Sequence, residues 1–464
     1  MNLAQALRLS HSPCLALVGA GGKTTALFRL ARELTTDGRP VLVTATTHLA
    51  VGQIRLADSH RIARSPADLA GLEAGMRGVT LVTGPVDGDR TSGLDPQSTD
   101  WLRAVSERQG IALLIEADGS RRRPLKAPGE NEPPIPEFVD LVLVVAGLSG
   151  LGRPLSEEFV HHPEAFARLS GLQPGDPVTA EALTRVLVHP EGGLKNVPAG
   201  ARRIVLLNQA DTPELQGRAN GLAERLLTAY DAVVIASLDP RPSIDDHQYE
   251  IHAALERTAG IVLAAGGSRR MGQPKQLLDY HGQSFVRAAA RTALEAGLSP
   301  VIVITGADAE AVEAAVRDLP VRIARNEGWQ QGQSSSIRAG LETLTQVLPS
   351  NQDSSTKSEG VGGSRVGAVL FLLADQPQVT PEVLRALVER HSRDLPPVVA
   401  PLVRDQRANP VLFDRATFPA LMALSGDVGG RAIFSRFPPA YLPWHDERLL
   451  VDADRPEDLK KLRD

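Results

Sequence analysis

The sequence predicts an α/β protein made of two α/β three-layer domains. Its 464 residues exceed the roughly 100–200 residues of an ordinary domain. Short apolar runs of strand length alternate with helix-length amphipathic stretches, a pattern typical of a largely parallel sheet covered by helices. This alternation occurs twice, and each half opens with an apolar run that ends in a glycine loop. We therefore expect one sheet in each half.

Apolar runs mark the expected strands, and the amphipathic stretches between them are the expected helices. In the first half the runs are Cys14–Val18, Val41–Ala45, Val79–Val82, Ile111–Ile115, Leu141–Ala146, Ile204–Leu207 and Ala232–Ala236. In the second half they are Ile261–Ala265, Val301–Thr305, Val369–Ala374, Val398–Pro401 and Val411–Phe413.

A Pro/Asp-rich cluster, Asp239–Asp246, separates the two halves. Clusters of this kind form turns rather than regular elements. We therefore expect a first domain over residues 1–245 and a second over 259–464. The linker between them, 246–258, is expected to contain a short helix around 250–257.

One segment of the second half has almost nothing to bury. Residues 349–367 read PSNQDSSTKSEGVGGSRVG, which is rich in serine and glycine. Such a composition is typical of flexible chain. We expect a flexible surface insertion within the second domain.

The overall composition excludes several classes of protein. A net charge of −5 gives no general attraction to nucleic acid or anionic lipid. Cys14 is the single cysteine, which rules out an intrachain disulfide or a cysteine zinc site and fits a reducing compartment. No stretch reaches the ~18 apolar residues of a membrane span. We expect a cytoplasmic protein that binds neither nucleic acid nor membranes.

The glycine loop of the second half carries the strongest chemical signal. The run GIVLAA ends in Gly266 and Gly267, where glycine lets successive backbone N–H groups point at one phosphate chain. Arg270 and Lys275 bring two cations to the same loop. Glycines, spaced cations and a preceding strand together favour a site for a nucleoside triphosphate.

An aspartate follows another expected strand of this half. Asp375 stands just past Val369–Ala374, at the edge where α/β sheets bind ligands. A carboxylate there is a natural ligand for Mg²⁺. In phosphoryl chemistry, positioning and charge neutralisation supply most of the catalysis, so we assign catalytic roles to Arg270, Lys275 and Asp375.

The second half resembles the MobA-like NTP transferase family, the molybdenum cofactor cytidylyl- and guanylyltransferases, whose loop reads roughly LAAGxSxRMGxxK. The resemblance runs from Gly260 to about Leu462. Besides the loop, the matching segments are Gln331–Leu341 (QGQSSSIRAGL), Leu373–Pro377 (LADQP), Asn409–Phe413 (NPVLF), Gly426–Arg431 (GDVGGR) and Val451–Leu459 (VDADRPEDL).

This resemblance implies a Rossmann-like nucleotidyltransferase domain of the glycosyltransferase-A-like type. It favours Asp454 over Asp452 as the second Mg²⁺ ligand beside Asp375. It assigns base or ribose binding to one of three consecutive serines, of which we take Ser335. The implied nucleotide-binding residues are Ala264, Ala265, Gly266, Gly267, Ser268, Arg270, Lys275, Ser335 and Asp375, and the implied acceptor-binding residues are Arg407, Asn409 and Asp427.

The resemblance also indicates which substrates to expect. Ala265, and the spacing between Gly272 and Lys275, look more like the cytidylyl branch than the guanylyl branch. We therefore expect CTP as the nucleotide and molybdopterin as the acceptor, giving molybdopterin cytosine dinucleotide and pyrophosphate. GTP, or a sugar or alcohol phosphate as acceptor, is the alternative.

The first half opens with a second phosphate-binding signal. An apolar run ends in GAGGKTT, followed by a helical pattern, which is the context of a P-loop. A Walker A loop has glycine where this chain has Leu17, so the loop is expected to be shorter or differently shaped. The expected nucleotide-binding residues are Gly19, Gly21, Gly22, Lys23, Thr24 and Thr25.

Two acidic residues stand at the end of another expected strand of the first half. Glu116 and Asp118 occupy the place of a Walker B-like carboxylate, and either can hold Mg²⁺ or orient water. We assign Asp118, together with Thr24, to the metal. The pair His161-His162 is expected to be a solvated loop pair, because no third metal ligand is identifiable from the sequence.

The first half, over about residues 10–245, resembles the YqeC family. The segments that carry this resemblance are Thr44–His48, Glu116–Ser120, Pro124–Pro128 and Glu132-Pro133. The family is described as accessory factors of selenium-dependent molybdenum hydroxylases, so a hydroxylase apoenzyme is an expected partner. A further alternative is that the chain is a nucleotide-dependent factor that delivers cofactor, with the second domain only a binding module.

Overall fold

The computed structural model describes residues 1–35, 38–238, 249–267, 273–347 and 366–451. The chain divides into two compact units, Met1–Leu255 and Glu256–Asp464. Three of the predicted site residues, Ser268, Arg270 and Asp454, lie outside the described residues.

The first unit is built on a parallel sheet with the strand order β12-β11-β9-β1-β7-β2-β4-β3. Every apolar run predicted for this half is a strand of this sheet. The exposed, polar edge strand β3 was missed because it lacks an apolar pattern, and the two-residue strands β5, β6, β8 and β10 were also not predicted. The strands are β1 (Cys14–Gly19), β2 (Val41–Ala45), β3 (Ser59–Ile62), β4 (Val79–Thr83), β7 (Ala112–Glu116), β9 (Leu141–Gly147), β11 (Arg202–Asn208) and β12 (Ala232–Leu238).

Capping residues set the ends of the helices in this unit. For example, α4 begins after Asp95, whose carboxylate accepts a 3.0 Å hydrogen bond from the backbone N–H of Ser98, and ends at Gly110 with φ of 61°. The helices are α1 (Leu3–Ala6), α2 (Lys23–Leu34), α3 (Leu72–Gly75), α4 (Pro96–Gln109), α5 (Pro163–Ser170), α6 (Ala180–Val188) and α7 (Pro213–Leu226). Two short ribbons pair β5 (Val86–Asp87) with β6 (Arg90–Thr91) and β8 (Leu125–Lys126) with β10 (Val160–His161).

Strand β1 lies at the point where the strand order of the first sheet reverses. It pairs with β7 on one side and β9 on the other, and the chain moves from β1 to β2 on the β7 side before it returns to β9. Ligands of open α/β sheets bind in the crevice that such a reversal opens at the carboxyl ends of the strands. The glycine loop that follows β1 therefore lies at the expected ligand edge.

The second unit has a mixed sheet. Strands β17, β16, β13 and β18 run parallel, and β21 joins β18 antiparallel, followed by β19 with its neighbours β20 and β22. The strands are β13 (Tyr249–Ala264), β16 (Val301–Thr305), β17 (Arg322–Arg325), β18 (Val366–Leu373), β19 (Val398–Val403), β20 (Gln406–Arg407), β21 (Val411–Asp414) and β22 (Ala440–Pro443), with β14 (Asp279–Tyr280) and β15 (Gln283–Ser284) as a separate pair.

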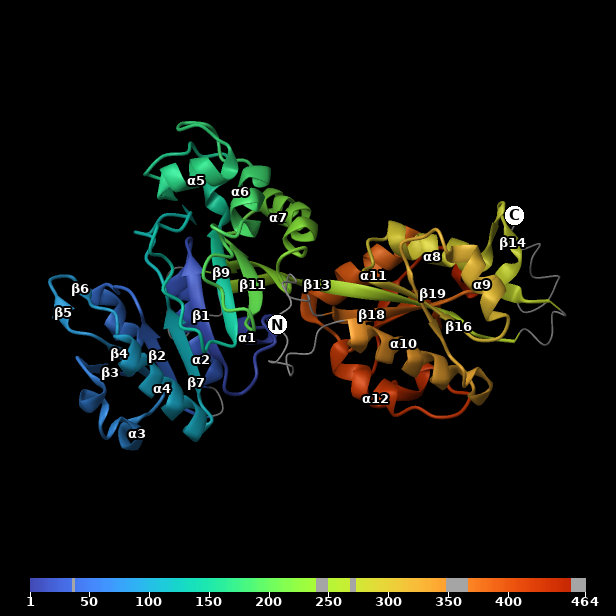
Figure 1. Cartoon of the computed structure of the whole chain (residues 1–464), viewed down its shortest axis with the longest axis horizontal. Helices are drawn as coiled ribbons and strands as arrows, with labels where there is room; N and C mark the ends of the chain where they lie inside the picture. The colour runs from blue at the N-terminus through green and yellow to red at the C-terminus, as the bar shows by residue number, and fades with distance from the viewer. Residues whose placement is uncertain (36–37, 239–248, 268–272, 348–365, 452–464) are drawn as a thin grey trace. The chain divides into compact units, whose positions relative to one another are not determined.

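Helices cover both faces of this second sheet (Figure 1). Adjacent residues of β13 point to opposite faces, so Val262 joins the core under α8 and α11, whereas Ile261 joins the core under α10 and α12. Both side chains are fully buried. The helices are α8 (Phe285–Glu295), α9 (Ala309–Val316), α10 (Gln333–Val347), α11 (Pro381–Asp394) and α12 (Phe418–Met422).

The helix predicted around residues 250–257 is wrong, and residues 249–258 of the expected linker belong to β13 instead. Their apolar residues repeat with a period of two, and Ile251 and Ala253 are buried. The intervening His252 accepts or donates a 2.9 Å hydrogen bond with the hydroxyl of Ser237 on β12. Side-chain alternation and this contact favour a strand over a helix.

The expected insertion lies largely outside the described residues, which resume at Val366. Its last two positions, Val366 and Gly367, are the first residues of β18 rather than part of a loop. None of the helices in the described part of the chain has the length and apolar character needed to cross a membrane.

Replacement of a buried hydroxyl tests the packing of the first unit. Tyr230 is 1% exposed, and its hydroxyl donates a 2.8 Å hydrogen bond to the backbone oxygen of Leu187. Tyr230→Phe leaves that oxygen without this donor, so we expect the free energy of unfolding to fall by about 1–3 kcal/mol. Chemical denaturation measures the change, with the exposed Tyr441→Phe as control. Equal stabilities of the two variants would contradict this role.

Candidate functional site

A cleft of about 560 Å³ opens beside the glycine loop of the second unit. It gathers main-chain and side-chain groups from segments that are far apart in the sequence. Its lining residues are Leu263, Ala265, Gly266, Gly267, Lys275, Gln276, Trp329, Gln330, Gln331, Gly332, Gln333, Ser336, Leu373, Ala374, Asp375 and Asp427.

Strand register explains why the glycine loop and the aspartate meet. Leu263 of β13 pairs with Leu373 of β18 in a parallel ladder, so the residues that follow both strands emerge at one edge. Lys275 begins the short 3₁₀ helix Lys275–Leu277. Its ammonium nitrogen lies 3.9 Å from Oδ2 of Asp375. The edge thus combines a cation, a carboxylate and a glycine backbone.

Two neighbours hold the glycine loop in place. The side-chain amide of Gln276 donates to the backbone oxygens of Ala264 and Gly266. A Cβ atom on Gly267 would lie 3.0 Å from the indole of Trp329, so a larger residue would crowd this wall. Within the described residues, no protein group accepts a hydrogen bond from the backbone N–H of Gly266 or Gly267. These two donors are therefore available to a ligand.

The three consecutive serines have different positions at the start of α10. Ser334 donates to the backbone oxygen of Gly426 over 2.6 Å, and Ser335 donates to that of Gly332 over 2.8 Å. Asn326 donates to the hydroxyls of Ser335 and Ser336. Of the three, Ser336 lines the cleft, whereas the predicted Ser335 is bonded within the protein.

The residues assigned to the acceptor do not all come together. Asp427 lines the cleft, and its Oδ1 accepts a 3.2 Å hydrogen bond from the backbone N–H of Gln333. Arg407 and Asn409 are not among the lining residues. The guanidinium of Arg407 lies over the ring of Phe434, 5.5 Å from its centroid.

In the first unit, the glycine loop links β1 to α2. Gly21 requires glycine because its φ is +84° and a Cβ atom would lie 2.4 Å from the Cα of Gly147. The buried Asn208 donates a 2.7 Å hydrogen bond to the backbone oxygen of Gly21, and its own Oδ1 accepts from the N–H of Leu238. The loop is therefore fixed by the neighbouring strands.

The loop lysine is paired inside the protein. The ammonium nitrogen of Lys23 lies 3.1 Å from Oδ1 of Asp118 and donates to the backbone oxygen of Gly19. Oδ2 of Asp118 lies 2.9 Å from the ammonium of Lys126 and accepts from the N–H of Gly19. Asp118 thus bridges two lysines, and all three charged side chains are at most 3% exposed.

The predicted metal ligand Thr24 contacts the other acidic residue. Its hydroxyl donates a 2.9 Å hydrogen bond to Oε2 of Glu116, a carboxyl whose pKa is raised by burial. In the described part of the chain, the backbone N–H groups of Gly22, Lys23 and Thr24 have no protein acceptor. These donors at the start of α2 are those that an anion would meet.

Comparisons with known proteins divide the chain in the same way. A family model for the YqeC protein matches residues 15–164, and a model for the MobA-like NTP transferase domain matches residues 260–441. The uncharacterized protein YqeC of Escherichia coli is 38% identical over 200 residues, which make up 42% of this chain and 75% of the relative. The chain is a fusion of a YqeC domain and a MobA-like NTP transferase domain. The protein is accordingly a nucleotidyltransferase.

Relatives of the MobA-like domain carry different names. The nicotine blue oxidoreductase of Paenarthrobacter nicotinovorans is 31% identical over 219 residues, 44% of this chain and 95% of that protein. Among solved structures, Rv0371c from Mycobacterium tuberculosis is 27% identical and matches with a TM-score of 0.36, covering 44% of this chain and 97% of its own.

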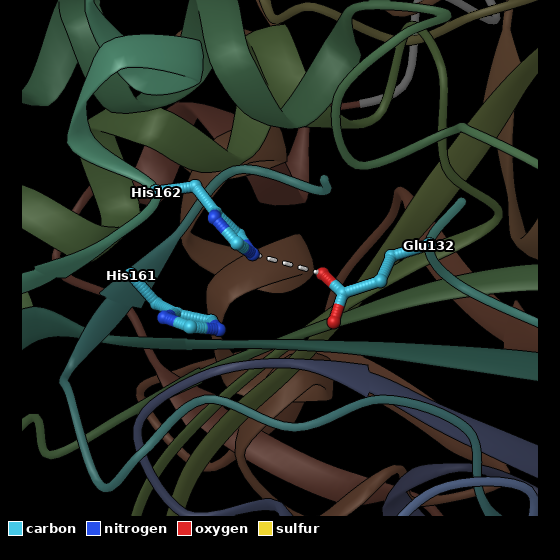
Figure 2. A group of neighbouring side chains, drawn as sticks. All are labelled: Glu132, His161 and His162. Carbon is cyan, nitrogen blue, oxygen red and sulfur yellow. Dashed lines mark ion pairs between the residues drawn. The ribbon is translucent and has the colours of Figure 1, made fainter. Parts of the chain in front are cut away.

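The YqeC domain contains a group of polar side chains that the sequence did not predict. Figure 2 shows the rings of His161 and His162 and the carboxylate of Glu132 facing one another. One ligand atom from each residue lies within 4.8 Å of the others. No third ligand was identifiable from the sequence because Glu132 is distant along the chain; the fold brings its carboxylate to the two histidines.

Lys126 connects this group to the glycine loop. Its ammonium lies 2.8 Å from Oε2 of Glu132 and also contacts Asp118. Burial alone would raise the pKa of Glu132, but Lys126, the N–H of Gly129 and His162 hold it below its usual value. Burial, together with the charges of His162 and Lys126, lowers the pKa of His161 to about 4.

Several residues of both sites escaped prediction because their signals are weak in sequence. Trp329 lies two residues before the matched segment Gln331–Leu341. It is one of three tryptophans in the chain, and this rarity could have marked it. Gln276 is an ordinary polar residue after the loop lysine. Lys126 lies inside the matched segment Pro124–Pro128, but no spacing rule connects it to Asp118.

A glycine substitution tests how the close approach of Gly332 and Asp427 shapes the MobA-like cleft. Gly332 has φ of +99°, and a Cβ atom would lie 2.4 Å from the Cα of Asp427. The ψ of Gly332, −178°, places it in a backbone region that essentially only glycine adopts, so Gly332→Ala should destabilise the domain by more than the about 1–3 kcal/mol of this backbone strain, and it should weaken nucleotide binding. Thermal denaturation and calorimetric titration measure the two effects.

Gly297→Ala is the matched control for this substitution. Gly297 also has a positive φ, of +81°, but a Cβ atom there meets nothing within 4 Å. It should show the backbone cost without loss of nucleotide affinity. If both variants behave alike, the contact with Asp427 does not shape the cleft.

Proposed function

We propose that the MobA-like domain transfers CMP from CTP to molybdopterin, giving molybdopterin cytosine dinucleotide and pyrophosphate. The single observation that carries this proposal is the cleft that brings Gly266, Gly267, Lys275 and Asp375 together. Two unpaired N–H donors, a cation and a carboxylate are the groups that a magnesium nucleotide requires.

Each group of the cleft has a role in this reaction. The N–H groups of Gly266 and Gly267 bind the triphosphate, and Lys275 neutralises charge that develops on the phosphate oxygens. The phosphate of molybdopterin attacks the α-phosphorus of CTP as pyrophosphate leaves, so no covalent enzyme intermediate is needed. Asp427, which also lines the cleft, orients the acceptor.

Asp375 is the residue of the described cleft that would hold Mg²⁺, because its carboxylate is a hard oxygen ligand at the ligand edge of the sheet. Bound there, the ion would neutralise phosphate charge. Asp454, the second proposed ligand, and Arg270 and Ser268 of the loop complete the assignment made from the sequence.

The YqeC domain is proposed to bind a second nucleotide, at the start of α2. The free N–H groups of Gly22, Lys23 and Thr24 would meet its phosphates. Glu116 is a stronger candidate than Asp118 for the carboxylate of a Mg²⁺ site, because Thr24 bonds to it while Asp118 is held by two lysines. This site would serve the maturation of a molybdenum hydroxylase in the cytoplasm.

Pyrophosphate release tests the transferase directly. The purified full-length chain is supplied with molybdopterin and with CTP, GTP or ATP in turn. We expect turnover with CTP, and Asp375→Asn should reduce it by about 100-fold or more, because charge stabilisation at the phosphates is lost.

Asp405→Asn, which removes an exposed carboxylate of the same domain, should leave turnover unchanged. Turnover with GTP instead of CTP would overturn the assignment of the base. Turnover only with a sugar or alcohol phosphate would overturn that of the acceptor, and nucleotide binding without turnover would favour the cofactor-delivery role.

The YqeC site is tested by nucleotide binding in the Asp375→Asn background. Lys23→Ala should weaken binding at this second site about 10–100-fold, the effect of removing one charged hydrogen bond. Lys195→Ala is the control, since Lys195 bonds to the backbone of Gly129 and Glu130 and not to the glycine loop. An unchanged stoichiometry and affinity in Lys23→Ala would argue against a working phosphate loop.

A further inference from the structure

Two consecutive histidines of the YqeC domain point to the same side of the chain, which a regular strand does not allow. His161 is the last residue of β10, and its partner across the ribbon is Lys126 of β8. His162 then adopts a left-handed conformation, with φ of 58° and ψ of 64°. This turn brings the two rings within 4.0 Å of each other, measured between centroids.

The third group comes from a loop that the protein holds firmly. Nε2 of His162 lies 3.3 Å from Oε2 of Glu132. The loop that carries Glu132 is fixed by Lys195, which donates to the backbone oxygens of Gly129 and Glu130 over 2.7 and 2.8 Å. The ligand groups are therefore positioned by the β8–β10 ribbon and by a separate, anchored loop.

Close packing also limits the size of the residue at position 129, beside these groups. A Cβ atom on Gly129 would lie 3.2 Å from Nε2 of His162 and 3.5 Å from Oε2 of Glu132. Both of these side chains remain partly open to solvent, with exposed fractions of 38% and 28%. An ion could therefore reach the group from solution.

The geometry points to a binding site for one divalent transition-metal ion, of which Zn²⁺ fits best, formed by His161, His162 and Glu132 (Figure 2). Two imidazoles and one carboxylate are a ligand set that Zn²⁺ accepts at about 2.0–2.2 Å. The present separations, all within 4.8 Å, require a modest contraction of the group. Three protein ligands leave a fourth position for water or a substrate oxygen.

The positive charge of Lys126 does not prevent a metal ion from binding at these three residues. The ammonium is shared between Glu132 and Asp118 and donates to the backbone oxygen of Gly119. Besides Lys126 and His162, the charges that act on His161 are the guanidinium of Arg121 and the carboxylate of Glu132. Lys126 instead acts as a support that orients the metal-binding carboxylate.

Zinc binding by the full-length chain tests the site. The protein, in the Asp375→Asn background to silence the carboxylate of the other domain, is stripped with a chelator and dialysed against Zn²⁺. We expect about one tightly bound ion per chain by elemental analysis. His161→Ala and His162→Asn should each weaken this binding by more than about 100-fold, beyond the about 10–100-fold that loss of a supporting group costs.

His162→Asn is chosen because asparagine tolerates the left-handed backbone, so the fold should persist, which circular dichroism checks. His11→Ala, at an exposed histidine of the same domain, is the matched control and should retain the ion. Replacement of Zn²⁺ by Co²⁺ should give a visible absorption that His161→Ala and His162→Asn lose. No bound zinc, or equal binding by every variant, would overturn the proposal.

Discussion

Parallel pairing between a central strand and both of its neighbours is what the two sites depend on. In the MobA-like domain, Leu263 pairs with Leu373 on one side and with Ile304 on the other. Because helices cover both faces, a shift of one residue would exchange Ile261 and Val262 between two different cores. The register is therefore strongly determined, and it delivers the glycine loop and Asp375 to one edge.

Sequence patterns predicted most strands of this scaffold because strands and the glycine loops that follow them are local features. Contacts between distant residues carry no such pattern. Glu132 is held near His161 and His162 only because β8 pairs with β10 and a separate loop turns back. Thr24 bonds to Glu116 rather than to Asp118; spacing alone could not distinguish these two acids. The helix predicted over 250–257 failed because these residues form part of β13, in which Ile251 and Ala253 are buried.

In the YqeC domain, the ion pairs around Asp118 both stabilise buried charges and position groups that would contact a ligand. Burying Lys23 and Lys126 costs free energy unless each ammonium has a counter-charge. Asp118 supplies it for both. Lys23 also contacts the glycine loop, and Lys126 also contacts Glu132. Groups that would contact ligands therefore have fixed positions before any ligand binds, which lowers the entropy lost on binding.

Trp329 gives the MobA-like domain a built-in optical probe. Its indole packs against Gly267 and lines the cleft, and it also borders a neighbouring hollow of about 480 Å³ with Asp308 and Arg325. Trp329 is the only tryptophan among the residues that line the cleft. Trp101 packs against the core of the first unit, and Trp444 packs against the core under α8 and α11. A base or phosphate that enters would change the polarity around this one indole, so its fluorescence reports occupancy of the cleft without a label.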